Sequence, residues 1–359
     1  MITISLCMIV KNEESCLSKC LESARDLVDE IIIVDTGSTD KTKDIAHMYT
    51  DKVFDFTWVN DFSKARNFSF SKASCDYQMW LDADDFISPE NQKKILYLKS
   101  NLDPNIDIVT FKYNTNFDNF GNPTLTSTRA RLMKRNKNYS WNDPVHEYIQ
   151  LSGNILYVNN IFITHAKQVP STDRNLKIYE TNLKNGMTLS PRGKYYFARE
   201  LKNHNRNIEA VYYFEQFLQE GKGWKEDNIA TCFNLAICYL LLNERTKILP
   251  ILIKSFEYDS PRAEITCQIG YYFMQCEDYK TARDWFLLTT RLDNKDIMGF
   301  KLNDYWYYIP HIELAVCYYK LGDLHNAIHH NEIAAKYKPQ SDAVIHNKNF
   351  FEKISTKDV

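Results

Sequence analysis

A group of three carboxylates within four residues ends an apolar run in the first quarter of the chain. The run Tyr77–Leu81 is followed by Asp82, Asp84 and Asp85. If the extended backbone continues past the run, Asp82 and Asp84 project to one side, where like charges are unfavourable unless a cation lies between them. Such oxygen ligands suit Mg²⁺ or Mn²⁺, which also hold phosphates. Asp-x-Asp also occurs in solvated turns, so the motif needs support from the rest of the chain.

Composition limits the classes of function. The 359 residues are enough for two domains, each with its own core. The 44 Lys and Arg nearly balance 46 Asp and Glu, so no overall field favours nucleic acid or an anionic membrane surface. No stretch approaches the roughly 18 apolar residues that a membrane span needs. Small, charged ligands stay compatible with this composition.

Cysteine usage and the first residues indicate the compartment. The nine cysteines contain no Cys-x-x-Cys pair, which disfavours a zinc ribbon or a thioredoxin-like site. Buried free thiols in a reducing compartment account for them. The apolar run Ile2–Val10 lacks a basic leader, so we interpret it as a strand and not as a signal peptide. We therefore expect a soluble, cytoplasmic protein.

The carboxylates must be positioned by a sheet. Over the first 90 residues, short β-rich runs alternate with amphipathic helical ones, which predicts a mainly parallel sheet with helices on both faces. A further helix begins at Pro89 with Ser88 as its cap. The runs after it suggest antiparallel strands added to the sheet. The expected strands are Thr3–Val10, Glu30–Val34, Val53–Phe56, Tyr77–Leu81, Ile106–Asn114, Thr126–Lys134 and Asn154–His165, and the expected helices are Glu14–Leu27, Lys41–Met48 and Ser63–Lys72.

Three of the predicted parallel strands end in polar residues. These ends are Lys11–Glu13, Asp35–Asp40 and Asp82–Asp85. Ligands of open α/β sheets bind at the carboxyl ends of strands, so we expect the three segments to meet. The second segment also fits a capped turn, with Ser38 or Thr39 as the N-cap of the next helix.

A cation lies in the same part of the sequence. Arg66 belongs to the run Asn60–Asn67, which is expected to begin a helix beside the same edge of the sheet. A guanidinium there could neutralise a diphosphate. The alternative is an ordinary exposed helix start capped by Asp61 or Ser63.

Taken together, these segments resemble glycosyltransferase family 2. Four blocks occur in the order found in that family: Leu6–Glu14, Glu30–Thr42, Asp61–Asn67 and Leu81–Asp85. The resemblance implies a GT-A fold that extends to about the strand Asn154–His165. It also implies a nucleoside-diphosphate sugar donor, with UDP favoured, a divalent metal, Mn²⁺ or Mg²⁺, and transfer with inversion at the anomeric carbon.

The resemblance assigns roles to individual residues. Asp84 binds the metal directly, and Asp82 reaches the metal through water and faces the ribose. Thr36 stands where many members have a second acid beside the base. A metal and a cation together stabilise the charge on the leaving diphosphate. The donor-binding positions implied in this way are Val10, Lys11, Glu13, Asp35, Arg66, Asp82 and Ala83.

Inversion also needs a general base on the acceptor side. The run Trp141–Glu147 combines an aromatic ring with three ionisable groups, and its Val-His-Glu sequence resembles bacterial glycosyltransferases that fuse a family 2 domain to helical repeats. We predict Glu147 as the base or acceptor ligand, followed by Asp143 and His146. The alternative is a polar pair formed by His146 and Glu147 beneath a loop.

A histidine follows the last predicted strand. His165 ends the run Ile161–Thr164, where some GT-A enzymes place a histidine close to the metal and diphosphate. We therefore add His165 to the predicted metal ligands Asp82 and Asp84. A histidine at a strand end can equally be structural.

From about residue 175 the chain becomes helical and repetitive. The second and third repeats lie 34 residues apart, the fourth follows after 45, and the insertion between them falls around Asn294–Asp304. This is the tetratricopeptide arrangement of paired helices, in which small residues permit close packing. Small residues (Ala198, Ala236, Gly270, Ala315) are followed at the third position by Leu201, Tyr239, Phe273 and Tyr318, at the twelfth by Ala210, Ile248, Ala282 and Ala327, and at the sixteenth by Phe214, Leu252, Phe286 and Asn331.

A helical-repeat array most often binds a partner or forms a dimer. A family 2 domain followed by such repeats resembles the sublancin-type peptide S-glycosyltransferases, which implies an acceptor that is a Cys or Ser side chain of a peptide. A homodimer formed through the repeats is a second use of the same surface. Its many Tyr and Trp side chains could also serve packing alone.

Two other functions stay open at this point. One is a polysaccharide or lipopolysaccharide glycosyltransferase, against which the lack of an apolar span weighs modestly. The other is a non-catalytic scaffold in which the repeats carry the function. The predicted organisation is a GT-A domain over residues 1–170, a linker or helix over 171–190, helical repeats over 191–345 and a tail over 346–359.

Overall fold

The protein is described by a computed structural model that covers residues 1–165, 172–293 and 299–355. The chain divides into two compact units, each described by itself below. The first comprises Met1–Tyr196 with Met298–Phe300, and the second comprises Phe197–Ile297 with Lys301–Val359. In the described ranges, no helix combines the length and the apolar character that crossing a membrane requires.

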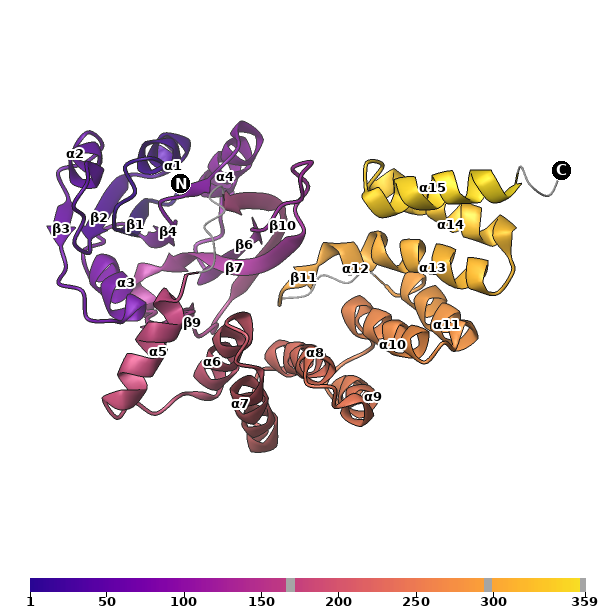
Figure 1. The fold of residues 1–359 in the computed structure, drawn as a ribbon. Coiled ribbons are helices and arrows are strands. Elements are labelled where there is room, and N and C mark those ends of the chain that lie inside the picture. The colour runs from indigo at the N-terminus through magenta and orange to yellow at the C-terminus, as the bar shows by residue number, and fades with distance from the viewer. Residues whose placement is uncertain (166–171, 294–298, 356–359) are drawn as a thin grey trace. The chain divides into compact units, whose positions relative to one another are not determined.

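The first unit is built on a mixed, mainly parallel sheet (Figure 1). Its strands run in the order β3-β2-β1-β4-β7-β6-β10-β5. The predicted parallel pairing of the first strands is confirmed, because β1 pairs in parallel with both β2 and β4. The bounds are β1 Ile4–Val10, β2 Glu30–Asp35, β3 Val53–Asp55, β4 Tyr77–Trp80, β5 Asp85–Phe86, β6 Ile108–Asn114, β7 Leu125–Lys134 and β10 Ile155–His165.

The expectation of antiparallel strands in the second half of the sheet is only partly right. Strand β7 runs antiparallel to both β4 and β6. Strand β10, however, pairs in parallel with β6 and is antiparallel only to the short strand β5. The carboxyl ends of β1, β2, β4, β6 and β10 consequently lie at one edge of the sheet, which the pattern of apolar runs did not reveal.

Helices cover both faces of this sheet, as alternation along β1 requires. Leu6 and Met8 point to one face, which α1, α2 and α4 cover, whereas Cys7 points to the face covered by α3 and a small hairpin. Asp61 and Ser88 cap α3 and α4, as predicted. The bounds are α1 Leu17–Ala24, η1 Arg25–Leu27, α2 Thr42–His47, α3 Phe62–Ser71, α4 Pro89–Asn101, η2 Arg135–Lys137, hairpin strands β8 Trp141–Asn142 and β9 Tyr148–Ile149, and α5 Arg174–Lys184.

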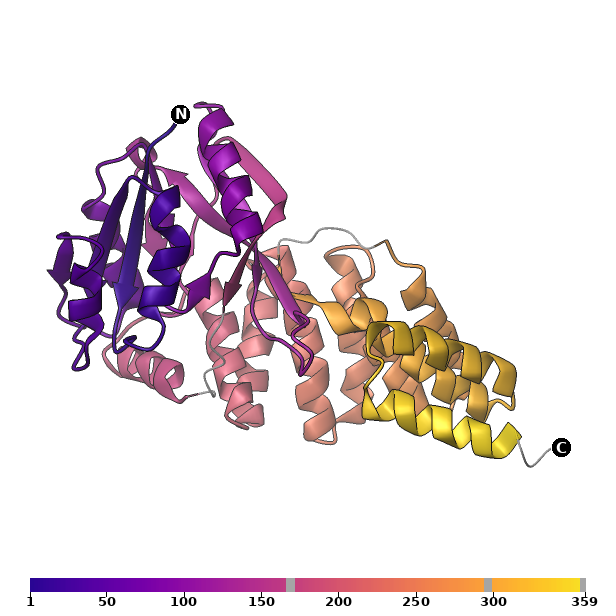
Figure 2. The same ribbon diagram turned by 90° about the horizontal axis from the view of Figure 1, so that it is seen from above.

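The second unit consists of helices that follow one another in antiparallel pairs (Figure 2). It begins within α6 and contains the helices that follow. Part of the insertion predicted around Asn294–Asp304 lies outside the described residues. The bounds are α6 Pro191–Asn203, α7 Asn207–Glu220, α8 Lys225–Leu241, α9 Arg245–Lys254, η3 Ser255–Glu257, α10 Ala263–Gln275, α11 Tyr279–Thr290, β11 Lys301–Leu302, α12 Asn303–Tyr307, α13 Ile309–Lys320, α14 Leu324–Tyr337 and α15 Asp342–Ser355.

The small residues of the repeats have the packing role that was predicted. A Cβ added to Gly270 would lie 2.7 Å from a ring atom of Phe286, so only glycine fits there. Ala198, Ala236 and Ala315 are buried in the corresponding places. Asn331 departs from the aromatic pattern, and its amide donates to the Val344 carbonyl of α15 at 3.1 Å.

Candidate functional site

The first polar group lies where β1 and β2 end. Val10 pairs with Asp35 in the register of the two strands, and both are buried. Asp35 Oδ1 accepts the N–H groups of Gly37 and Ser38 at 2.8 Å each. Its second oxygen, Oδ2, is buried and has no hydrogen-bond partner in the described part of the chain. A buried acceptor without a donor costs free energy, so this atom can take an N–H group from a ligand.

The loops after β1 and β2 are tied together. Asn12 has a left-handed backbone (φ 55°), and its side chain accepts the N–H of Thr39 at 2.8 Å. Thr42 accepts the N–H of Glu13 at 2.7 Å. The Cys16 thiol approaches Glu13 Oε2 at 3.0 Å, while Lys11 is exposed. Lys11 and Glu13 are therefore held at the rim of the strand ends, as predicted from the fold.

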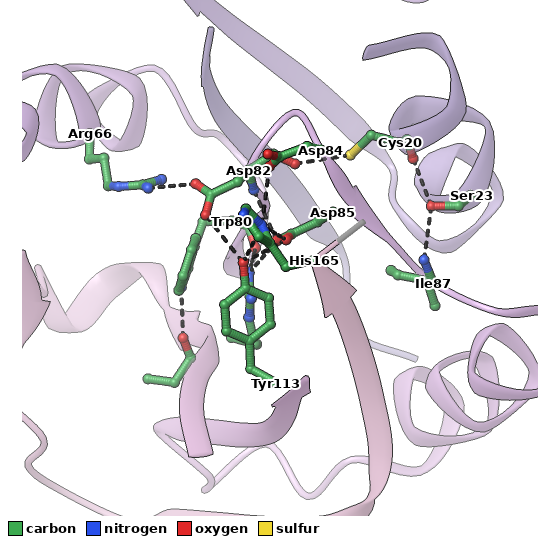
Figure 3. Close-up of polar contacts among 12 residues, drawn as sticks. Cys20, Ser23, Arg66, Trp80, Asp82, Asp84, Asp85, Ile87, Tyr113 and His165 are labelled. Carbon is green, nitrogen blue, oxygen red and sulfur yellow. Dashed lines mark hydrogen bonds and ion pairs between the residues drawn. The ribbon is translucent and has the colours of Figure 1, made fainter. Parts of the chain in front are cut away.

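The aspartate run forms a turn, which differs from the extended path expected from the sequence. Strand β4 ends at Trp80, and Asp85 donates its N–H to the Asp82 carbonyl at 3.0 Å. Asp82 in return donates its N–H to Asp85 Oδ2 at 3.1 Å. Ala83 is buried inside this turn. The tight turn brings the carboxylates together although they do not continue a strand (Figure 3).

Asp85 is fully committed to protein contacts. Its Oδ2 accepts from Arg131 at 3.1 Å, and its Oδ1 accepts from the Tyr113 hydroxyl at 2.7 Å. Arg131 is completely buried and lies over the Trp80 ring at 3.8 Å. In the pairing of β6 with β7 it falls at the register shift, which marks a β-bulge. A bulge redirects a side chain, and this one directs a guanidinium beneath the aspartate turn.

His165 joins the aspartates from the end of β10 (Figure 3). Its Nδ1 lies 3.2 Å from Asp84 Oδ1, 3.3 Å from Asp85 Oδ1 and 2.9 Å from the Tyr113 hydroxyl. Burial disfavours the charged ring, but the hydrogen bond to Asp85 and the charges of Asp84 and Asp82 raise the pKa of His165 above its ordinary value. Burial, reinforced by Asp82 and Asp85, raises the pKa of Asp84 to about 6 although His165 opposes it.

These groups fit a divalent cation. Ligand atoms of Asp82, Asp85 and His165 all lie within 4.8 Å of one another. Because the oxygens of Asp85 already serve Arg131 and Tyr113, the groups left for a metal are Asp82, Asp84 and His165. Carboxylate and imidazole ligands suit Mn²⁺, and carboxylates suit Mg²⁺. The structure thus brings Asp82 and His165, two of the predicted metal ligands, together with Asp85, and the third, Asp84, lies 3.2 Å from His165 Nδ1.

Arg66 lies on the other side of Asp82. It donates to Asp82 Oδ1 at 2.7 Å and to Glu147 Oε1 at 2.5 Å. Its guanidinium is buried, 4.8 Å from the ring of Trp80 and 4.9 Å from that of Trp141. Burial works against the charge, but Asp82 and Glu147 raise the pKa of Arg66 above its ordinary value. The alternative to the predicted role, an ordinary exposed helix start, is therefore wrong for this side chain, although Asp61 does cap the helix.

The loop between β8 and β9 holds the residues predicted for the acceptor side. Both Asp143 (φ 66°) and His146 (φ 55°) have left-handed backbone conformations, which cost energy and cluster at functional sites. Asp143 Oδ2 accepts from the Ser190 hydroxyl at 2.8 Å. Burial raises the pKa of Asp143, with the Ser190 hydrogen bond opposing. The His146 ring stacks on Tyr196 with centroids 4.3 Å apart.

Sequence reasoning missed Tyr113 and Arg131, which hold the aspartate turn from below. The available signal was Arg131, a charged residue between Ala130 and Leu132 in the strand Leu125–Lys134. A strand interior tolerates a buried guanidinium only when it is paired, and its partner could not be named without the fold. The interaction of Glu147 with Arg66 joins residues 81 positions apart and was equally unreadable.

Comparison with known families agrees with this geometry. Residues 5–156 match the glycosyl transferase family 2. The match ends within β10, and the tetratricopeptide-like helical region follows it.

Two curated relatives each resemble part of the chain. The SPbeta prophage-derived glycosyltransferase SunS of Bacillus subtilis is 28% identical over 72% of this chain and 64% of its own length. This chain thus spans less than two thirds of that relative. A TPR repeat-containing protein of Synechococcus elongatus is 46% identical over 24% of this chain and 21% of its own length.

A solved structure also shows a distant likeness. Glucosyl-3-phosphoglycerate synthase from Mycobacterium tuberculosis, in complex with Mg²⁺ and uridine diphosphate, is 24% identical. It covers 31% of this chain and 44% of its own, with a TM-score of 0.27. A score this low supports no conclusion about ligands.

Proposed function

We propose that this protein is a metal-dependent, inverting glycosyltransferase that moves a sugar from a nucleoside-diphosphate sugar, with UDP favoured, to a peptide side chain. One observation carries the proposal. In a family 2 domain, Asp82, Asp84 and His165 converge at the strand ends beside a buried arginine, Arg66. Clustered titratable groups with shifted pKa values, such as Asp84 and His165, are typical of functional sites.

The donor would lie across the ends of β2, β1 and β4. Asp35 Oδ2, the buried acceptor without a partner, would take an N–H group of the base, such as the imide of uracil. Val10 would contact the nucleoside, while Lys11 and Glu13 would reach its ribose. From β2 to β4 is two strand spacings, about 10 Å, which fits a nucleoside followed by its phosphates. Because its side chain is small, Ala83 would let the donor lie close to the backbone of the turn.

The metal would be held by Asp82, Asp84 and His165. When bound, Mn²⁺ or Mg²⁺ supplies positive charge to the diphosphate as the sugar–phosphate bond breaks. Tyr113 and Arg131 would keep Asp85 in place and so fix the turn that presents the ligands. Arg66 would add a second, permanent positive charge on the opposite side of Asp82.

The general base would be Asp143, not Glu147, which was the first choice from sequence. Glu147 already neutralises Arg66 at 2.5 Å, so its role would be to position that cation. Asp143 has a raised pKa and therefore accepts a proton more readily. It would remove the proton from the acceptor hydroxyl or thiol, with His146 beside it as an acceptor contact.

The helical repeats would hold the acceptor peptide or a second copy of the chain. Tetratricopeptide-like arrays present extended concave surfaces suited to peptides. Similarity to SunS extends past the family 2 domain, which is consistent with a shared two-part arrangement. A Cys or Ser side chain would receive the sugar.

A hydrolysis assay tests the proposal without knowledge of the acceptor. Purified protein is incubated with a panel of UDP-sugars and Mn²⁺, and released UDP is measured. We expect release that stops in EDTA and in Asp84→Ala, but persists in Asp103→Ala, a control at an exposed aspartate. Equal release by Asp84→Ala and the wild type would refute the metal assignment.

A further inference from the structure

In the part of the chain that the structure describes, one arginine near the site lacks a counter-charge. Arg129 lies on β7 opposite Phe111 and is half-buried. Within residues 1–165, 172–293 and 299–355 it makes neither a hydrogen bond nor an ion pair, and its guanidinium only approaches the ring of Phe300, at 5.4 Å. Arginine stays charged in proteins, so this cation is uncompensated.

The surroundings of Arg129 increase the cost of its charge. Burial lowers the pKa of Arg129, and the cations Arg192 and Arg131 act in the same direction, whereas Tyr196 and Tyr113 oppose them. None of these four neighbours is a carboxylate. A partly buried charge without a partner destabilises a fold, and a ligand that supplies the opposite charge is one reason for it to be present.

The groups around it form an amphipathic wall. Arg192 donates to the Tyr196 hydroxyl at 3.0 Å and lies over the rings of Tyr148 and Tyr196 at 5.0 and 4.8 Å. The His146 ring stacks on the Tyr196 ring. Asp143 is the nearby acid that Arg192 influences, and it is hydrogen-bonded to Ser190. Aromatic faces beside guanidinium groups suit a peptide that carries an anionic group.

The order of the strands gives this wall its place in the reaction. The sequence of neighbours is β2-β1-β4-β7, with Asp35 at the end of β2 and the aspartate turn after β4. Arg129 lies on β7, on the far side of the aspartate turn from Asp35. A donor extended from Asp35 to the metal ligands therefore places its sugar between the diphosphate and Arg129, which leaves Arg129 on the acceptor side.

We infer that Arg129, with Arg192 beside it, forms a subsite for a carboxylate of the acceptor peptide. The acceptor then carries an Asp, a Glu or its own C-terminal carboxylate close to the side chain that receives the sugar. The inference rests on the proposed function for the identity of the neighbouring site. A guanidinium binds a carboxylate through two parallel hydrogen bonds, which fixes orientation as well as position.

Binding of labelled peptides tests the subsite. The probes are a fluorescein-labelled peptide that contains several Asp residues and the same peptide with Asn in their place, measured by anisotropy at low ionic strength. The wild type should bind the Asp peptide about tenfold more tightly than the Asn peptide. Arg129→Met should abolish the difference, whereas Arg25→Met, a control at an exposed arginine, should preserve it. Equal binding of both peptides by the wild type would overturn the inference.

Two further measurements separate the alternatives. UDP affinity with Mn²⁺ should be the same in Arg129→Met and the wild type, and a tenfold loss would assign Arg129 to the donor instead. Arg129→Met should unfold at the same or a higher temperature, since an uncompensated charge is removed; a large decrease would show a structural cation and overturn the subsite. If Arg129→Met did not fold, Arg129→Lys should keep a weakened preference for the Asp peptide. Failure of UDP to bind the wild type would count against the proposed function alone.

Discussion

The carboxyl edge of the N-terminal sheet and the interior of the helical repeats use buried side chains in opposite ways. At the sheet edge, Arg66 is a buried charge and Asp84 a partly buried one, and Asp143 and His146 in the loop between β8 and β9 have left-handed backbones. In the repeats, Gly270 and its alanine counterparts follow the packing pattern closely. The repeats also hold a residue with positive φ, Glu277, and a buried carboxylate, Glu264, so the two regions differ chiefly in that the sheet edge gathers its charges around one turn.

Asp84→Asn should separate activity from stability most strongly. UDP-sugar hydrolysis should fall by about two orders of magnitude or more, because a direct metal ligand is lost. Without metal, Asp84→Asn should be more stable than the wild type by about 1–2 kcal/mol, because burial disfavours the charged carboxylate and raises the pKa of Asp84 to about 6. The partial exposure of Asp84 keeps this gain in stability below what the pKa shift alone would give. Denaturant unfolding in EDTA measures the second effect. A variant that loses both activity and stability would mean that Asp84 is structural.

Glu147→Gln should be the costliest change for stability at the same edge. Removing this carboxylate leaves Arg66 with Asp82 alone, at a cost of about 2–4 kcal/mol. Urea unfolding checks the value, and Glu90→Gln, which removes an exposed ion pair, is the control in which we expect little change. Asp143→Asn should cost less than 1 kcal/mol, because burial disfavours its charge. If Asp143→Asn destabilised the protein more than Glu147→Gln, Glu147 would be the better candidate for the base and Asp143 for the positioning residue.

In the repeats, Gly270→Ala should destabilise without touching chemistry. The added Cβ overlaps the Phe286 ring, and overpacking of this kind costs about 1–3 kcal/mol. Combining it with Phe286→Leu should recover part of the loss, which a double-mutant cycle on unfolding free energies detects. Additive losses would show that the two positions are not in contact.

The smallest expected effect is a pH dependence in the repeats. Burial, with His330 and His329 nearby, lowers the pKa of His311 to about 4, so the folded state holds a neutral ring. The unfolded chain takes up the proton first, so the stabilising effect is complete above about pH 6.5 and is lost as pH falls towards 4. Between pH 7 and pH 5, the free energy of unfolding of the wild type should therefore fall by about 1 kcal/mol more than that of His311→Phe, as measured by denaturant unfolding at both pH values. His325→Gln, on the same helix as His330, should follow the wild type.

Much of the fold was readable from the sequence, because hydrophobic periodicity fixes strands and helices locally. The strands up to β4, the caps Asp61 and Ser88, and the repeat pattern were predicted in this way. The direction of β10 was not, since an apolar run does not reveal which neighbour it pairs with. The candidate site could be predicted where its residues are close in sequence, as Asp82 and Asp84 are. It could not be predicted where distant residues meet in the fold, as Arg66 and Glu147 do.

The most direct test of the donor site is a thermal shift of the protein against nucleoside diphosphates with and without Mn²⁺. A ligand at 100 times its dissociation constant adds about 2.7 kcal/mol to the stability of the state that binds it. We predict that UDP stabilises the wild type in Mn²⁺ but not in EDTA, and that Asp84→Asn removes the effect. Stabilisation that is equal in Mn²⁺ and EDTA, or absent with every nucleotide, would contradict the account.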